Sequence, residues 1–195
     1  MLLSPFGAPV NDARPRMNVR VATPGDIPSL QQLIEQSVRG LSGGFYTPAQ
    51  IDAAMAQVFG VDTQLIADGT YYVIDGTTGP AAAGGWSGRR TLFGGDQMKG
   101  AQDPLLDPAT EAARIRAFFV HPDWARRGLA RQLYSACEMA ALGAGFRRFE
   151  LMATMPGVPL YAALGFVAQE QVVLPLANGV DVPFVRMMRE LSDGG

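Results

Sequence analysis

The stretch that decides the fold spans residues 118–131 and reads Phe118-Phe119-Val120-His121-Pro122-Asp123-Trp124-Ala125-Arg126-Arg127-Gly128-Leu129-Ala130-Arg131. The apolar run before His121-Pro122 predicts a buried strand, and the proline predicts where that strand ends. Beyond the turn, apolar residues recur at helical spacing through Leu129, Leu133 and Cys137. This stretch therefore predicts a strand, a tight turn and a helix that begins at Gly128.

The first turn of this helix has the properties of a phosphate site. A helix N-terminus presents unpaired N–H groups and a partial positive charge, and both attract phosphate. Gly128 and Ala130 have almost no side chain, so a pyrophosphate can approach the backbone there. Arg126, Arg127 and Arg131 add positive charge around the same point. On these residues alone, plain helix capping with solvated arginines explains the pattern equally well.

The rest of the chain predicts an α/β (α+β) fold with a single mixed sheet. Apolar patterns predict strands over 18–21, 71–74, 81–86, 115–120, 149–153, 166–176 and 182–188. Helical spacing predicts helices over 27–38, 48–58, 129–140 and 158–164. We therefore expect a central sheet of about six to seven strands flanked by about four helices.

Two segments outside these elements help to set the domain organisation. Residues 1–16 contain three prolines and no periodicity, so we expect a loose N-terminal extension before one domain over 17–192. Residues 88–110 have no clear period and are rich in Gly, Asp and Pro. A connection of this length inside a compact domain is usually functional or mobile.

Composition excludes several classes of protein. The chain has 195 residues and a formal net charge of −2, so no overall positive field favours nucleic acid. Cys137 is the single cysteine and His121 the single histidine, which leaves no intrachain disulfide and no Cys/His zinc cluster. No apolar run reaches the length of a membrane span, and residues 1–10 lack the pattern of a secretion signal. We expect a cytoplasmic protein without a metal and without nucleic-acid or membrane partners.

Two motifs in this sequence resemble those of the GCN5-related N-acetyltransferase (GNAT) superfamily. The family's acyl-CoA motif is [QR]-x-x-G-x-[GA] after Val-x-Pro, and here Ala125-Arg126-Arg127-Gly128-Leu129-Ala130 follows Val120-His121-Pro122. Ala125 departs from the usual Gln or Arg. The segment Leu160-Tyr161-Ala162-Ala163-Leu164-Gly165-Phe166 looks like the family's Phe-Tyr-x-x-x-Gly-Phe signature, with Leu160 in place of the first aromatic residue. The resemblance covers about residues 17–192 and is clearest from 114 to 166.

The resemblance implies a GNAT-like fold, acetyl-CoA as co-substrate and direct attack of an acceptor amine on the thioester. It implies that Tyr161 protonates the departing thiolate and that a backbone N–H near Phe119 or Val120 stabilises the oxyanion. The alternative for Tyr161 is a half-buried helix tyrosine without a catalytic role. The implied coenzyme-binding residues are Phe118, Phe119, Val120, Arg126, Arg127, Gly128, Leu129, Ala130, Arg131 and Tyr161.

The general base is harder to place. Members of the family often carry a glutamate near the position of Arg114, and an arginine cannot take up a proton at working pH. Water or a residue of the long connection must then serve. Glu111 and Asp96 are the candidates, and we take Glu111 as the catalytic residue. The alternative for both is a surface carboxylate without a catalytic role.

The acceptor site is predicted from four residues. Phe45 and Tyr46, in the glycine-rich break after the first helix, are candidates for lining the acceptor pocket, with ordinary packing as the alternative. Arg114 and Arg116 suit an anionic group of the acceptor, because guanidinium matches carboxylate geometry. Their alternative is a solvated strand end or an ion pair with Glu111. Arg89, Arg90, Phe93 and Asp96 set specificity if their connection folds over this site.

The leading hypothesis is an acyl-CoA-dependent N-acyltransferase, favouring acetyl-CoA and a primary amine of a small molecule. A non-catalytic acyl-CoA-binding or regulatory module is the alternative, motivated by the missing glutamate. A different nucleotide binder is a third hypothesis, although neither G-x-x-x-x-G-K-[ST] nor G-x-G-x-x-G occurs. A homodimer is possible, since the C-terminal strands are free to pair between chains.

Overall fold

The computed structural model describes residues 17–100 and 102–191. The expected N-terminal extension over residues 1–16 and the last expected residue of the domain, residue 192, lie outside the described residues.

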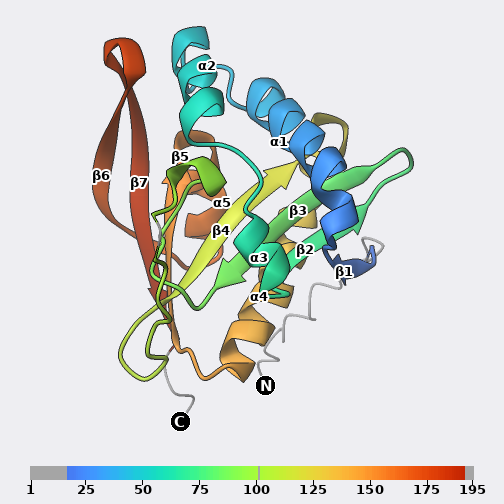
Figure 1. Cartoon of the computed structure of the whole chain (residues 1–195), viewed down its shortest axis with the longest axis vertical. Coiled ribbons are helices and arrows are strands. Elements are labelled where there is room, and N and C mark those ends of the chain that lie inside the picture. Colours follow the sequence, from blue (N-terminus) through green and yellow to red (C-terminus); the bar gives the residue numbers. More distant parts are fainter. Residues whose placement is uncertain (1–16, 101, 192–195) are drawn as a thin grey trace, which may run out of the picture.

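One mixed sheet forms the centre of the molecule, as the sequence predicts (Figure 1). In the described part of the chain its seven strands are β1 (Val19–Val21), β2 (Tyr71–Asp75), β3 (Pro80–Ser87), β4 (Ala113–Val120), β5 (Arg148–Thr154), β6 (Val167–Leu176) and β7 (Val180–Glu190). Their spatial order is β1-β2-β3-β4-β5-β7-β6. Neighbouring strands are antiparallel except for β4 and β5, which are parallel.

Helices cover both faces of the sheet. Within the described residues the α-helices are α1 (Ile27–Leu41), α2 (Pro48–Gln57), α3 (Thr63–Ala67), α4 (Leu129–Gly143) and α5 (Val158–Ala163). Neighbouring strand residues point to opposite faces. Val73 accordingly packs in the cluster of α1, while Ile74 packs with the first turns of α4. The sequence missed only α3, because five residues are too few to show a helical period.

The strands β4 and β5 separate soon after they meet. Their parallel register contains only two pairs, Ala113 with Phe149 and Arg114 with Glu150. Beyond these pairs β5 continues alongside β7 as far as Thr154 and Phe184, while β4 continues alongside β3. The middle of the sheet is therefore open at the carboxyl ends of β4 and β5.

A bulge in β4 determines which face of the sheet each of two adjacent phenylalanines occupies. Ala117 has a φ of 55°, and the register of β3 against β4 shifts between Ala83 and Gly85 at the same place. The hydroxyl of Tyr71 donates to the Ala117 carbonyl at 3.2 Å, which stabilises the bulge. As a result Phe118 packs on the α4 side of the sheet and Phe119 on the α1 side.

The segment between β3 and β4 is irregular, as predicted, apart from a single 3-10 turn at Asp96–Met98. Ion pairs fasten it to the region of α3. Arg89 pairs with Asp68 at 2.7 Å, and Lys99 pairs with the buried carboxylate of Asp62. This long connection thus packs against the domain near the opening in the sheet.

Candidate active site

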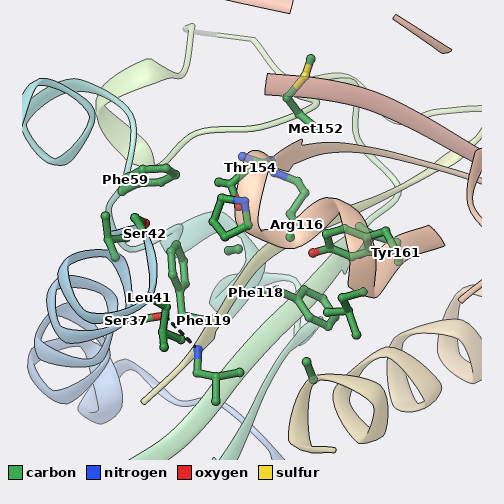
Figure 2. A pocket seen from close by; sticks show the side chains of 18 of the residues that line it. Ser37, Leu41, Ser42, Phe59, Arg116, Phe118, Phe119, Met152, Thr154 and Tyr161 are labelled. Atoms are coloured by element: carbon green, nitrogen blue, oxygen red, sulfur yellow. Dashed lines mark hydrogen bonds between the residues drawn. The ribbon is translucent and has the colours of Figure 1, made fainter. Parts of the chain in front are cut away.

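A cavity of about 870 Å³ occupies the opening between β4 and β5 (Figure 2). This is near the upper end of the size range of small-molecule pockets. Elements from both faces of the sheet contribute to its walls, together with the long connection before β4. The predicted site residues that line it are Phe45, Arg116, Phe118, Phe119, Val120, Arg126, Gly128, Leu129, Ala130, Arg131 and Tyr161. The structure therefore brings most of the predicted site together.

The N-terminus of α4 opens into this cavity without a cap. The helices α2 and α3 are capped by the side chains of Thr47 and Asp62, which accept hydrogen bonds from backbone N–H groups. The N-cap of α4 is Gly128, with a φ of 84°, and it offers no side-chain acceptor. The first N–H groups of α4 are thus available to an anion in the cavity.

The arginines around this helix N-terminus differ in position. Arg126 and Arg131 line the cavity. Arg126 has a φ of 61°, which is uncommon for a residue other than glycine and is found at functional loops. Arg127 does not line the cavity, because its guanidinium lies over the ring of Trp124 at 4.8 Å. Around this helix N-terminus, the positive charge at the cavity wall therefore comes from Arg126 and Arg131.

The end of β4 forms the floor of the cavity. Phe118 and Phe119 line its two sides, and Val120 follows them. The N–H of Val120 donates to Oγ of Ser37 at 3.1 Å, which is drawn in Figure 2. Of the two N–H groups predicted for the oxyanion, that of Val120 donates to Ser37, which also lines the cavity. Phe119 pairs with Ala83 in the antiparallel ladder, and because the N–H of His121 donates to the Ala81 carbonyl, the N–H of Phe119 also faces β3. Val120 is therefore the one of the two whose N–H faces away from β3.

Tyr161 directs its hydroxyl into the cavity from α5 (Figure 2). Its ring is buried and packs edge-to-face against Phe118 at 6.3 Å and Phe166 at 5.8 Å. Burial raises the pKa of the Tyr161 hydroxyl well above its ordinary value. The hydroxyl therefore stays protonated at neutral pH, as a proton donor must.

The two aromatic residues predicted for the acceptor site lie in different surroundings. Phe45 lines the rim of the cavity and is 52% exposed. Tyr46 is buried and does not line the cavity, because its hydroxyl donates to the Pro183 carbonyl at 2.7 Å and accepts from the N–H of Met155 at 2.9 Å. Tyr46 thus joins the turn before α2 to β7 and the end of β5, and the structure does not place it where an acceptor binds.

Arg114 also lies away from the cavity. It forms an ion pair with Glu150 on β5, which also pairs with Arg186 on β7. This pairing replaces the predicted one with Glu111. Because Arg114 is not at the cavity wall, the structure does not support its prediction as an acceptor-binding residue.

Glu111 is not positioned as a general base. It precedes β4, at the opposite end of the strand from the bulge and the helix N-terminus. Its carboxylate accepts from the N–H of Asp107 at 2.8 Å and pairs with Arg90 at 3.5 Å. Asp96, the other candidate, accepts from the N–H of Thr63 at 3.0 Å. Among the described residues, no aspartate, glutamate or histidine lines the cavity.

Several lining residues were not predicted from the sequence. Ser37, Phe59, Met152, Thr154 and Phe184 come from four separate elements or their ends. Their apolar or small side chains at helix and strand periods indicate burial but not which cavity they face. Only the packing of distant segments identifies them.

Cys137 and His121 have structural positions. Cys137 is buried in the core on α4, and burial raises the pKa of its thiol above the usual range. Nδ1 of His121 accepts from the N–H of Asp123 at 3.2 Å and so supports the turn after β4.

Over residues 17–100 and 102–191, no three His, Cys, Asp or Glu side chains are grouped as a metal site would require. In the same part of the chain, none of the helices combines the length and the apolar character needed to cross a membrane.

Comparison with known proteins identifies the class. The family model described as "Acetyltransferase (GNAT) domain" matches residues 105–191. This matched region, which contains β4, the N-terminus of α4 and Tyr161, is similar to the GNAT acetyltransferase domain. Among curated proteins, no sequence matches the chain.

Solved structures extend the likeness to the whole fold. A GCN5-related N-acetyltransferase from Rhodopseudomonas palustris is 19% identical, with a TM-score of 0.67 over 92% of this chain and 98% of that one. The PaiA N-acetyltransferase from Thermoplasma acidophilum in complex with coenzyme A is 11% identical, with a TM-score of 0.61 over 90% and 99%. A phosphinothricin acetyltransferase from Sinorhizobium meliloti in complex with acetyl-CoA is 18% identical, with a TM-score of 0.60 over 91% and 90%. The described chain therefore has the GNAT fold.

Proposed function

We propose that this protein transfers the acetyl group of acetyl-CoA to a primary amine of a small molecule. The observation that carries the proposal is the meeting of three features in one cavity. These are the uncapped N-terminus of α4, the open edge of β4 and the protonated hydroxyl of Tyr161. The family model that matches residues 105–191 and the coenzyme complexes of similar folds support the same co-substrate.

The coenzyme binds along the α4 side of the cavity in this proposal. Its diphosphate accepts hydrogen bonds from the backbone N–H groups between Arg127 and Arg131, and Arg126 and Arg131 compensate its charge. The pantetheine arm follows β4 beyond Arg114, where β5 no longer pairs with it. Phe118 then lies beside the thioester end of the arm.

The reaction is a direct displacement at the thioester carbonyl. The acceptor nitrogen forms the new C–N bond, and the carbonyl oxygen accepts a hydrogen bond from the N–H of Val120, in place of Ser37, while it carries negative charge. The C–S bond then breaks, and the Tyr161 hydroxyl protonates the thiolate. The amine loses its extra proton to water, and a solvent proton restores Tyr161.

The absence of acidic groups at the described cavity wall suits an amine that arrives uncharged. The charged side chains that line the cavity are Arg116, Arg126 and Arg131. Cations nearby lower the pKa of an ammonium group, because they disfavour its charged form. The neutral amine is the nucleophile, so the site needs no carboxylate in the position of Arg114.

The walls of the acceptor side favour a small molecule over a protein. Leu92 and Phe93 of the long connection and Phe59 at the end of α2 line the cavity beside Phe119. The long connection, the end of α2 and β4 thus surround this part of the cavity. A space enclosed in this way suits a compact acceptor better than an extended peptide.

Calorimetry with CoA, ATP and NAD tests the coenzyme assignment, and release of CoA thiol with a panel of amines tests turnover. We expect CoA to bind and at least one amine to be acetylated. Preference for ATP or NAD would refute the coenzyme assignment. CoA binding without turnover on any amine would instead favour a non-catalytic acyl-CoA-binding module, which the absence of a carboxylate at the described cavity wall allows.

A further inference from the structure

The acceptor side of the cavity is an aromatic pocket. Phe59 packs edge-to-face against Phe119 at 6.1 Å and against Phe184 at 6.3 Å, and Phe93 packs against Phe184 at 5.9 Å. Met152 belongs to the same cluster, and all five side chains line the cavity. An apolar group of a ligand gains most by burial against such a surface.

A single arginine interrupts this apolar surface. Arg116 lines the cavity although its side chain is only 2% exposed. Its Nη2 donates to the Gly94 carbonyl at 2.6 Å, and among the described residues no other nitrogen of the guanidinium donates a hydrogen bond. Nε in particular is buried without a partner. Arg116 thus retains donors that the fold does not use.

The carboxylate next to Arg116 does not satisfy all of its donors. Oδ2 of Asp62 lies 2.9 Å from Nη2 of Arg116, but this oxygen accepts no hydrogen bond among the described residues. Oδ1 of Asp62 is shared with Lys99, whose side chain is 13% exposed. Lys99 also pairs with Asp96 at 3.4 Å. Because Nε of Arg116 has no acceptor among the described residues, a carboxylate of a ligand at Arg116 would gain hydrogen bonds that the fold does not supply.

From these observations we infer that the acceptor is a small amine that carries an apolar side chain and one carboxylate, as an apolar amino acid does. The side chain packs on the Phe59 and Phe184 rings, and the carboxylate accepts hydrogen bonds from Arg116. The amine is then directed to the thioester beside Phe119. This inference rests on the proposed function and specifies its acceptor. Polycationic amines do not fit, because the described wall offers them cations and no carboxylate.

Matched pairs of acceptors test the inference on the full-length protein with acetyl-CoA. L-Phenylalanine is compared with phenethylamine and L-leucine with isoamylamine, and each pair differs only in the carboxylate. Spermidine and a lysine-containing peptide complete the panel. We expect kcat/KM to be at least about tenfold higher for the carboxylate-bearing member of a pair, because a site built to bind a polar group rejects analogues that lack it. Equal rates within pairs, or preference for spermidine or the peptide, would overturn the inference.

The variant Arg116→Met identifies the residue responsible. We expect it to raise KM for the carboxylate-bearing acceptor about tenfold or more and to change KM for its decarboxylated partner less than about threefold. Arg114→Met is the matched control, since Arg114 lies on the same strand but outside the cavity. Each substitution leaves the facing carboxylate one cation, Lys99 for Asp62 and Arg186 for Glu150. Equal effects of Arg116→Met on both members of a pair would count against the carboxylate contact.

Two further measurements distinguish a failure of the acceptor inference from a failure of the proposed function. If Arg116→Met does not fold, thermal unfolding of the wild-type protein with CoA replaces it. L-Phenylalanine must then raise Tm more than phenethylamine does, and the reverse order refutes the inference. If CoA binds and other amines are acetylated while no apolar amino acid is, the acceptor inference fails and the proposed function stands. If CoA does not bind, both fail.

Discussion

The backbone N–H of Val120 donates a hydrogen bond to Oγ of Ser37 at 3.1 Å and so joins the end of β4 to α1 (Figure 2). Both residues line the cavity, and Ser37 is buried. The position of the strand edge that holds the coenzyme in our proposal therefore depends on a side chain from the opposite face of the sheet.

Replacement of Ser37 by alanine should leave the Val120 N–H without its partner. This hydrogen bond is only partly buried, and an intramolecular hydrogen bond contributes about 0.5–1.5 kcal/mol, so we expect the free energy of unfolding to fall by about that amount. KM for acetyl-CoA should rise several-fold as the strand end moves. Urea unfolding and steady-state kinetics measure the two effects. Ser135→Ala, at an exposed position on α4, is the control and should change stability by less than about 0.5 kcal/mol.

Replacement of Tyr161 by phenylalanine should remove the proton donor and keep the ring contacts with Phe118 and Phe166. We expect kcat to fall about 100-fold and KM for acetyl-CoA to stay unchanged. This loss is at the lower end of the range of rate effects for a positioned acid, because a thiolate is a good leaving group. Tyr134→Phe is the control, since its hydroxyl donates to Glu138 at 3.2 Å outside the main cavity. Wild-type turnover of Tyr161→Phe at every pH would remove Tyr161 as the acid.

A comparison of two glycines should separate backbone strain from phosphate binding. Gly128 and Gly145 flank the two ends of α4 with φ values of 84° and 94°, so alanine at either position costs about 1–2 kcal/mol of strain. Only Gly128→Ala also adds a methyl group beside the proposed diphosphate. Calorimetry should then show a Kd for CoA at least about tenfold higher for Gly128→Ala and unchanged for Gly145→Ala. Equal CoA affinities for the two variants would show that the diphosphate does not bind at this helix N-terminus.

Gly84 makes room for Phe118 across the bulge. A Cβ at Gly84 would lie 2.7 Å from the Phe118 ring, closer than real contacts allow. We expect Gly84→Ala to displace that ring, to destabilise the fold by about 1–3 kcal/mol and to raise KM for acetyl-CoA. Gly88→Ala is the control, because its Cβ would meet the Phe146 ring at an ordinary 3.4 Å. An unchanged KM for Gly84→Ala would show that the position of Phe118 does not matter for coenzyme binding.

The pH dependence of kcat/KM should follow the pKa of the acceptor amine and not the pKa of a carboxylate of the protein. The amine is protonated and unreactive below its pKa, so kcat/KM should rise as pH rises toward that value. Burial raises the pKa of Tyr161, so the acid remains protonated and no falling limb is expected below about pH 10. Rates measured from pH 6 to pH 9.5 with two amines of different pKa give the test. An inflection at one fixed pH for both amines would indicate a base in the protein.

The local sequence was enough to predict the strand, turn and helix around Gly128. These elements depend on neighbouring residues: an apolar run ends at Pro122, and a helix without a capping side chain begins after Gly128. The final pair of strands was predicted for a similar reason, since Asn178-Gly179 suits the positive φ that both residues adopt. Contiguous residues encode such features, because the interactions involved span only a few positions.

Beyond the residues around Gly128 and Tyr161 that the sequence motifs predicted, tertiary structure decided which side chains line the cavity. Arg114 and Arg116 are two residues apart on the same strand, yet one pairs with Glu150 away from the cavity and the other lines it. Ser37 lies 83 residues before the N–H that it accepts. These positions follow from where β4 and β5 separate and from how α1, α3 and the long connection pack around the gap. Packing between distant segments has no period or motif in the sequence, so only the folded chain shows which side chains share the site.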